Sequence, residues 1–161
     1  MRCILALFTL LILVPAASAQ DWEAYENARF GYAIDLPPGF SGSGEPANGD
    51  GQVFFSADGT QLLRVHGGNA LDGFEEAVEG AMEAARDIGW TLTYERVTPS
   101  WASFSGTRNG LITYARAIAL CGGEQYASFQ LDYPERDLDR MHAVVERLVA
   151  SLKPTGNGVS C

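Results

Sequence analysis

The stretch Leu111-Ile-Thr-Tyr-Ala-Arg-Ala-Ile-Ala-Leu120 decides the fold. Successive side chains of a β-strand point to opposite faces of its sheet, so this segment would present one face of large residues and one of small residues. The large residues are Ile112, Tyr114, Ile118 and Leu120, and the small residues are Thr113, Ala115, Ala117 and Ala119. The small-residue face leaves room for a helix to pack closely, and a ligand groove on that face is the alternative interpretation.

The segments on either side of this strand alternate in the same way and are joined by short turns. Alternating patterns cover residues 91–97, 101–106 and 124–133. Asn109-Gly110 separates residues 101–106 from residues 111–120, and Gly122-Gly123 separates residues 111–120 from residues 124–133. Both dipeptides favour tight hairpins, whereas parallel neighbours would need much longer crossovers. These strands are therefore predicted to pair antiparallel.

The N-terminal half adds three more predicted strands. Residues 30–36 alternate, and residues 41–51 have no apolar period, which is typical of an exposed loop. Val53-Phe54-Phe55 and residues 62–65 then flank Asp58-Gly59, another dipeptide that favours a hairpin.

Two segments have the three- to four-residue spacing of an amphipathic helix. The apolar positions are Phe74, Ala77, Val78, Ala81, Met82, Ala85 and Ile88 in residues 71–90, and Leu138, Met141, Val144, Val145, Leu148 and Leu152 in residues 137–153. Asp72 and Glu75 have the spacing of a capping box at the start of the first helix.

This order of elements predicts an α+β domain in which one antiparallel sheet of about six or seven strands packs with two helices. The spacing of the apolar residues leaves open whether both helices cover the same face of the sheet. The core is expected to contain Phe30, Ile34, Phe74, Val78, Tyr114, Ile118, Leu131, Val145 and Leu148.

The first 19 residues have the pattern of a cleavable secretory signal peptide. A basic residue at position 2 precedes an almost wholly apolar run over residues 4–14, and Ala17-Ser18-Ala19 has the A-x-A form of a cleavage site. The run has 11 residues, whereas a membrane-spanning helix needs about 20, so a permanent anchor is the weaker alternative. Cleavage is expected between Ala19 and Gln20.

Cleavage would leave one domain over residues 20–153 and a flexible tail over residues 154–161. The chain has 11 Lys and Arg against 20 Asp and Glu, a net charge of −9, which becomes −10 when Arg2 is removed. Such a charge argues against nucleic acid and anionic lipid surfaces as partners. The arginines also fall singly on separate segments, at Arg29, Arg64, Arg86, Arg96, Arg108 and Arg116.

No group of residues specifies a reaction, so no catalytic, cofactor-binding or metal site is predicted. Residues 39–43 lack the second glycine of a Gly-x-Ser-x-Gly nucleophile elbow. His66 and His142, the only histidines, are interpreted as structural or surface residues, and Asn48-Gly49-Asp50-Gly51 as a solvated turn. The acid pairs Glu75-Glu76 and Asp137-Asp139 fall in first helical turns, where carboxylates favour the helix dipole.

The pattern Tyr25-x-Asn27-x-x-Phe30-Gly31-Tyr32-x-Ile34-x-Leu36-Pro37-x-Gly39-Phe40 resembles the opening of PsbP-like proteins, which share a fold superfamily with the Mog proteins. The order of elements from about residue 22 to residue 153 is also similar. The resemblance implies an α/β/α sandwich and an accessory or partner-binding role. It implies no functional residue, because features of the plant members are not matched.

The leading hypothesis is thus a non-enzymatic bacterial protein, periplasmic or secreted, that binds another protein of the envelope. No cofactor, nucleic acid or membrane association after signal cleavage is expected. A small-ligand-binding module that uses residues 40–51 and the alanine-rich sheet face is the alternative. An enzyme whose site cannot be read from residue spacing stays open, and the sequence leaves the oligomeric state open.

Cys121 and Cys161 are the two cysteines that remain after Cys3 leaves with the signal peptide. Disulfides form and persist in exported proteins. The strand over residues 124–133 would lead about 33 Å away from Cys121, and the helix over residues 137–153 would return about 25 Å. The tail over residues 154–161 is then long enough to bring Cys161 to Cys121. The alternative is a buried Cys121 thiol and a free terminal Cys161 that links dimers.

Processing is the first testable prediction. Protein purified from the producing cell should begin at Gln20 or its cyclised form, because residues 17–19 present the cleavage site. Intact-mass measurement checks this, and a mature species that still carries Leu13 would contradict it.

Overall fold

The computed structural model describes residues 21–156 and residue 161. The predicted signal peptide and its cleavage site at Ala19 and Gln20 lie outside the described residues. The elements in chain order are β1 (Glu23–Asn27), β2 (Tyr32–Leu36), β3 (Phe40–Gly42), β4 (Gly51–Ser56), β5 (Leu62–Asn69), α1 (Phe74–Asp87), β6 (Thr91–Val97), β7 (Trp101–Arg108), β8 (Leu111–Leu120), β9 (Gln125–Pro134), α2 (Leu138–Ser151) and β10 (Lys153–Pro154). Single 3₁₀ turns, η1 (Cys121–Gly123) and η2 (Glu135–Asp137), flank β9.

The main sheet has seven strands in the order β3-β4-β5-β9-β8-β7-β6, and every neighbouring pair is antiparallel. The α+β class and the antiparallel sheet of about six or seven strands are thus confirmed. The expectation of a single sheet is wrong, because β2 leaves the main sheet and pairs with β1 and β10 in a second sheet of three strands. The strands β1, β3 and β10 were not predicted, since they have five, three and two residues and show no clear period.

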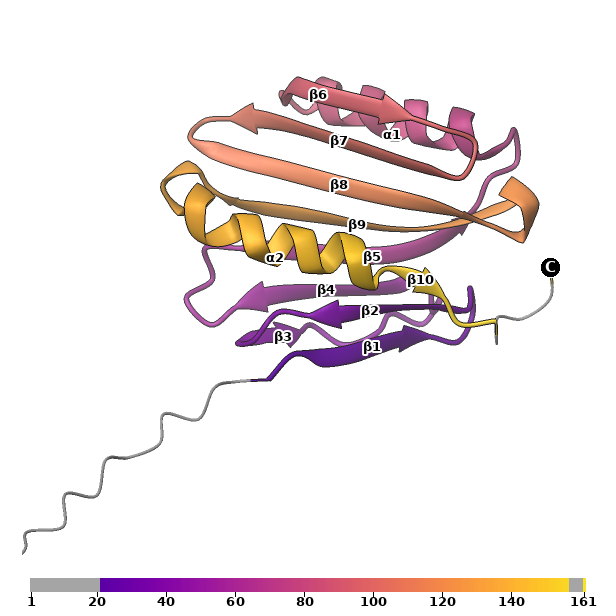
Figure 1. The fold of residues 1–161 in the computed structure, drawn as a ribbon, viewed down its shortest axis with the longest axis horizontal. Coiled ribbons are helices and arrows are strands. Elements are labelled where there is room, and N and C mark those ends of the chain that lie inside the picture. The colour runs from indigo at the N-terminus through magenta and orange to yellow at the C-terminus, as the bar shows by residue number, and fades with distance from the viewer. Residues whose placement is uncertain (1–20, 157–160) are drawn as a thin grey trace, which may run out of the picture.

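The two helices cover opposite faces of the main sheet, as Figure 1 shows with α2 in front and α1 behind. On the α1 face, Phe74, Val78 and Met82 pack against Phe104 and Ala115. On the α2 face, the residues of α2 share a core with β9 and with the second sheet, which includes Met141, Leu148, Phe129, Leu131, Tyr32 and Ile34. The molecule is therefore an α/β/α sandwich in which the second sheet shares a layer with α2.

The alternation of β8 decides which helix meets which face. Ala115, Ala117 and Ala119 belong to the cluster that includes α1, whereas Ile112, Tyr114, Ile118 and Leu120 belong to the cluster that includes α2. A helix does lie on the small-residue face, but α1 packs on β6 and β7 and leaves a cavity next to Ala115 and Ala117 of β8. Of the predicted core, six residues are buried, and Tyr114, Ile118 and Val145 are only half-buried.

Two local predictions need correction. Helix α1 begins at Phe74 after Gly73, whose φ of 100° favours glycine, and no side chain caps its first turn. Asp72 therefore forms no capping box with Glu75. The segment expected as a loop over residues 41–51 contributes Ser41 and Gly42 to β3 and Gly51 to β4.

The loop between β3 and β4 is held by Asn27, a residue of the PsbP-like pattern. The Asn27 side chain is 1% exposed and donates to Gly49 O at 2.8 Å and to Glu45 Oε1 at 3.1 Å. Its Oδ1 accepts from the Phe30 amide at 2.9 Å. One buried amide thus ties the end of β1 to the following turn and to the loop.

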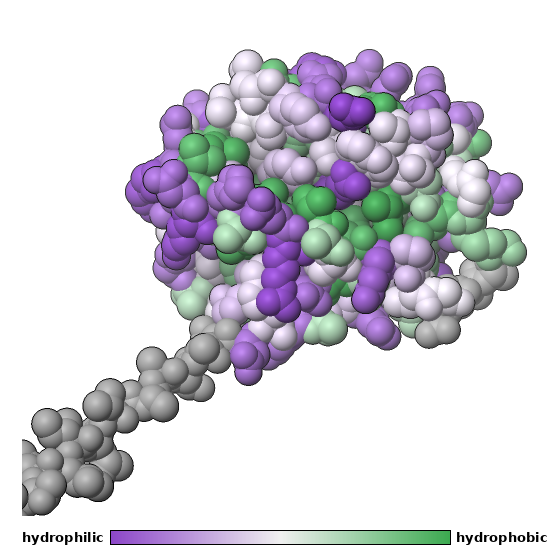
Figure 2. Space-filling model, in the orientation of Figure 1, coloured by the Kyte–Doolittle hydropathy of each residue, from purple (hydrophilic) through white to green (hydrophobic). Residues whose placement is uncertain are grey.

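Each helix covers only part of its face. α1 contacts β6 and β7, whereas α2 contacts β8, β9 and β2. The α2 face is therefore free of a helix over β6 and β7, and the α1 face is free of one over β4 and β5. Figure 2 shows the α2 face, where pale side chains with a few strongly hydrophilic ones lie over β6 to β8, above an apolar strip beside α2. Among the described residues, no helix is long and apolar enough to cross a membrane.

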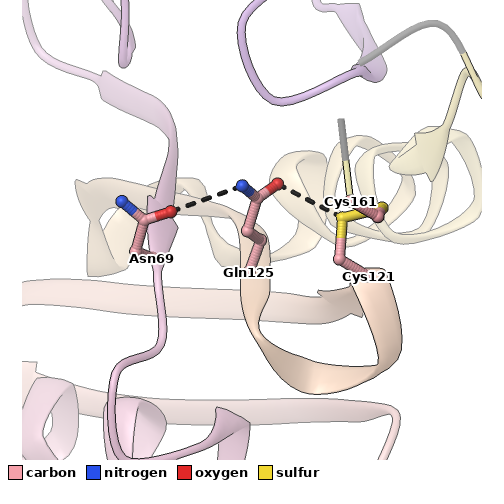
Figure 3. The surroundings of a disulfide bond; sticks show 4 residues. All are labelled: Asn69, Cys121, Gln125 and Cys161. Carbon is pink, nitrogen blue, oxygen red and sulfur yellow. Dashed lines mark hydrogen bonds between the residues drawn. A yellow bond between two sulfur atoms is a disulfide. The ribbon is translucent and has the colours of Figure 1, made fainter. Parts of the chain in front are cut away.

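Cys121 and Cys161 are joined by a disulfide in the structure, with 5.1 Å between their Cα atoms. Cys121 opens η1 at the end of β8, and Figure 3 shows it beside Gln125 and Asn69. Gln125 Nε2 donates to Asn69 Oδ1 at 3.3 Å. Gln125 Oε1 lies 3.3 Å from Cys121 Sγ, a contact rather than a hydrogen bond because a disulfide sulfur carries no hydrogen.

Replacement of Cys161 by Ser should lower the free energy of unfolding, because the bond closes a loop with a sequence separation of 40. The chain-entropy model sets the upper limit at about 4 kcal/mol. Urea unfolding of the oxidised wild type and of Cys161→Ser measures the difference, with the reduced wild type as the matched control. Two free thiols in the denatured, unreduced wild type would contradict the bond, and a covalent dimer would favour the intermolecular alternative.

Candidate functional site

The open part of the α2 face carries a group of arginine and aromatic side chains, here named the arginine–tryptophan patch. It comprises Tyr94, Arg96, Trp101, Ser103, Tyr114 and Arg116. Arg96, Ser103 and Arg116 are directly paired across β6, β7 and β8, so their side chains share one face. Tyr94 and Tyr114 occupy the next row, on either side of Ser105.

Two guanidinium groups lie against one indole ring at the centre of this patch. Arg116 Cζ is 4.1 Å from the centroid of the Trp101 ring, and Arg96 Cζ is 5.6 Å from it. Trp101 is half-buried, while Arg96 is exposed. Cation–π attraction stabilises each contact by about 0.5–1 kcal/mol at exposed sites, so Trp101 holds two like charges near one another.

The guanidinium group of Arg116 has hydrogen-bond partners for only some of its nitrogen atoms. Its Nη1 donates to Ser103 Oγ at 3.2 Å, and the Tyr114 hydroxyl donates to the same oxygen at 3.3 Å. Among buried side-chain nitrogen and oxygen atoms of the described residues, Arg116 Nε alone has no hydrogen-bond partner. Burial lowers the pKa of Arg116, but an arginine stays charged at neutral pH. The site therefore holds a positive charge that has lost part of its hydration.

Neither arginine of the patch is neutralised by a carboxylate of the described chain. Five other arginines form ion pairs with Asp or Glu, namely Arg29, Arg64, Arg86, Arg140 and Arg147. Arg96 and Arg116 have no carboxylate oxygen within 4.0 Å among the described residues. On a chain with a net charge of −9, the patch is thus a local cationic site without an internal counter-ion.

The residues weighed during sequence analysis do not meet at one site. His142 is exposed on α2, 3.8 Å from Glu146, while His66 lies on the α1 face beside Ser128. Asp50 pairs with Arg29, and Asp137 pairs with Arg140. Glu75 and Glu76 occupy the first turn of α1. Within the described residues, no three His, Cys, Asp or Glu side chains are grouped so that they could hold a metal ion.

Sequence analysis missed the patch because its arginines are 20 residues apart and on different predicted strands. The expectation that the arginines do not cluster is wrong for Arg96 and Arg116. Counting residues outward from the tight turn at Asn109-Gly110 could have placed Arg116, since this turn fixes the register of β7 with β8 and puts Arg116 opposite Ser103. The bulge between Leu92 and Tyr94 shifts β6 against β7, and no sequence signal indicated it.

Comparison with known proteins reveals structural neighbours but no sequence relatives. No protein-family model matches the sequence, and no curated protein matches it. The solution structure of CyanoP, a cyanobacterial PsbP protein from Synechocystis, is 15% identical, covers 89% of this chain and 98% of its own, and has a TM-score of 0.64. The Ran-binding protein Mog1p from Saccharomyces cerevisiae is 12% identical, with 85% and 97% coverage and a TM-score of 0.62. The chain therefore has the fold that PsbP and Mog1 share, as its N-terminal pattern indicates.

Proposed function

We propose that this chain is an exported, non-enzymatic binding protein that recognises another protein of the bacterial envelope through the arginine–tryptophan patch. The observation that carries the proposal is the buried Arg116 Nε without a hydrogen-bond partner, in a guanidinium stacked on Trp101. A buried polar group that lacks a partner in a folded protein calls for an explanation, and an arginine awaiting a ligand supplies one.

The composition of the patch matches a protein interface. Trp, Tyr and Arg are the residue types that dominate binding energy in protein complexes, and the patch contains Trp101, two tyrosines and two arginines. Tyr94 is 44% exposed, which gives a partner access to an aromatic ring. Among the structural neighbours, Mog1p is described as a Ran-binding protein, which supports a protein partner.

Charge decides what the partner presents. Because Arg96 and Arg116 lack an internal carboxylate, the partner is expected to place one or two Asp or Glu side chains against them. A wholly acidic partner would be repelled by the rest of the chain. The proposed partner therefore carries a local acidic segment on an otherwise mixed surface.

Export supports an envelope partner. The pattern of the first 19 residues is that of a signal peptide, and a disulfide between Cys121 and Cys161 suits an oxidising compartment. The proposed location is the periplasm or the extracellular space of a bacterium.

Replacement of Arg116 or Trp101 by Ala should weaken partner binding by about 30-fold, as for interface residues that contribute 2 kcal/mol or more. The mature protein, immobilised and exposed to envelope extract from the producing bacterium, should enrich one protein that neither variant retains, and binding of that purified protein can then be measured. Affinity should also fall as ionic strength rises, because the contact is charged.

The matched control is Arg140→Ala, since Arg140 is an exposed arginine on α2 whose side chain is 64% exposed. Thermal unfolding shows whether each variant is folded. A partner that binds wild type, Arg116→Ala and Trp101→Ala equally would contradict the site. Absence of any specific partner, together with turnover of a substrate by the purified protein, would contradict the function.

A further inference from the structure

The α1 face of the sheet carries a cavity on the opposite side from the arginine–tryptophan patch, and of the patch residues Arg116 also belongs to its lining. It has a volume of about 70 Å³ and lies between α1 and the small-residue face of β8. Ala77 and Ala81 of α1 and Ala115 and Ala117 of β8 line its apolar part. His66, Tyr126, Ser128, Gln130 and Arg116 are the polar residues of its lining.

His66 also lines a second, open groove of about 370 Å³. This groove lies between the loop that leads into β4 and the strand β5, and its polar lining includes Asn48, Asp50 and Arg64. The apolar cavity and this groove, whose lining is also mainly apolar, therefore share one histidine, which supplies a polar group to both. That arrangement is suited to a ligand with an apolar end and a polar end.

The chemistry at His66 favours a hydrogen bond over a charge. Ser128 Oγ lies 3.2 Å from His66 Nδ1, and the Tyr126 ring meets the imidazole edge-on at 5.7 Å. Desolvation by the neighbouring groups lowers the pKa of His66, against an opposing effect of Asp50, although the residue stays accessible to solvent. A neutral imidazole offers one donor and one acceptor.

The charges around the groove are already compensated. Arg64 pairs with Asp132 at 2.7 Å, and Arg29 pairs with Asp50 at 2.5 Å. A charged ligand would meet no unpaired counter-ion here, unlike at the patch on the other face. The volume of the cavity also limits the size of the ligand's apolar end. An apolar cavity of about 150 Å³ holds benzene, and this one has less than half that volume.

We propose that this site binds a small, neutral, amphipathic molecule. An apolar end of a few carbon atoms enters the cavity under α1, and a hydroxyl or amide group at the other end forms hydrogen bonds with His66. The proposal does not depend on the partner site, because the two lie on opposite faces of the sheet and Arg116, which belongs to both linings, has no role in it.

Titration of the ¹⁵N-labelled mature protein with 1-butanol, followed by two-dimensional NMR, tests the proposal. The backbone amides of Ala77, Ala117 and His66 should shift in a saturable way. In the series ethanol, 1-propanol and 1-butanol, each added methylene should tighten binding about fourfold until the cavity is full. This series uses only the wild-type chain, so it does not depend on any variant folding.

Two pairs of variants locate the site. Ala77→Leu fills the cavity and should weaken 1-butanol binding at least tenfold, while Ala84→Leu, an exposed position on the same helix, should leave it unchanged. His66→Ala should weaken binding about threefold to tenfold, and His142→Ala should not. Unsaturable shifts, affinities independent of chain length, or equal binding by wild type and a folded Ala77→Leu would each overturn the proposal.

Discussion

The architecture depends on the alternation of large and small side chains along β8. This strand lies in the interior of the main sheet, with β7 and β9 as its neighbours. Its alanines face the α1 cluster on one side, and Ile112, Tyr114 and Ile118 fill the space toward α2 on the other. A slip of one residue would exchange the two faces, so the register of β8 determines where both helices can pack.

Seven strands and one helix per face leave part of each face open. Neighbouring strands are about 4.8 Å apart, whereas a helix with its side chains is about 10–12 Å wide, so one helix spans two or three strands. The second sheet, β1-β2-β10, extends the cover on the α2 side near β4 and β5. The uncovered parts of the two faces differ in chemistry. Over β6 to β8 lie aromatic rings and two arginines without a carboxylate partner among the described residues, whereas compensated charges and His66 lie over β5 and β9.

Sequence patterns predicted both helices, the antiparallel pairing of β6 to β9 and the cysteine pair, because each depends on local period or on residue count. They could not show that residues 32–36 join a separate sheet, since alternation does not identify the partner strand. The open faces also escaped prediction, because they depend on which strands each helix crosses. Arg116 illustrates this limit: its position on β8 was predictable, but its contact with Trp101 and its missing partner required the register of three strands.

Fluorescence quenching of single-tryptophan variants tests the central claim most directly, namely that β8 separates a helix-covered face from an open cationic face. Trp101 is half-buried beside two arginines, whereas Trp90 is 3% exposed in the α1 cluster. With the other two tryptophans replaced by Phe, Trp101 should be quenched more strongly by iodide than by caesium, despite the net charge of −9. Trp90 should be protected from both ions. A protected Trp101, or one that caesium quenches more strongly than iodide, would contradict the account.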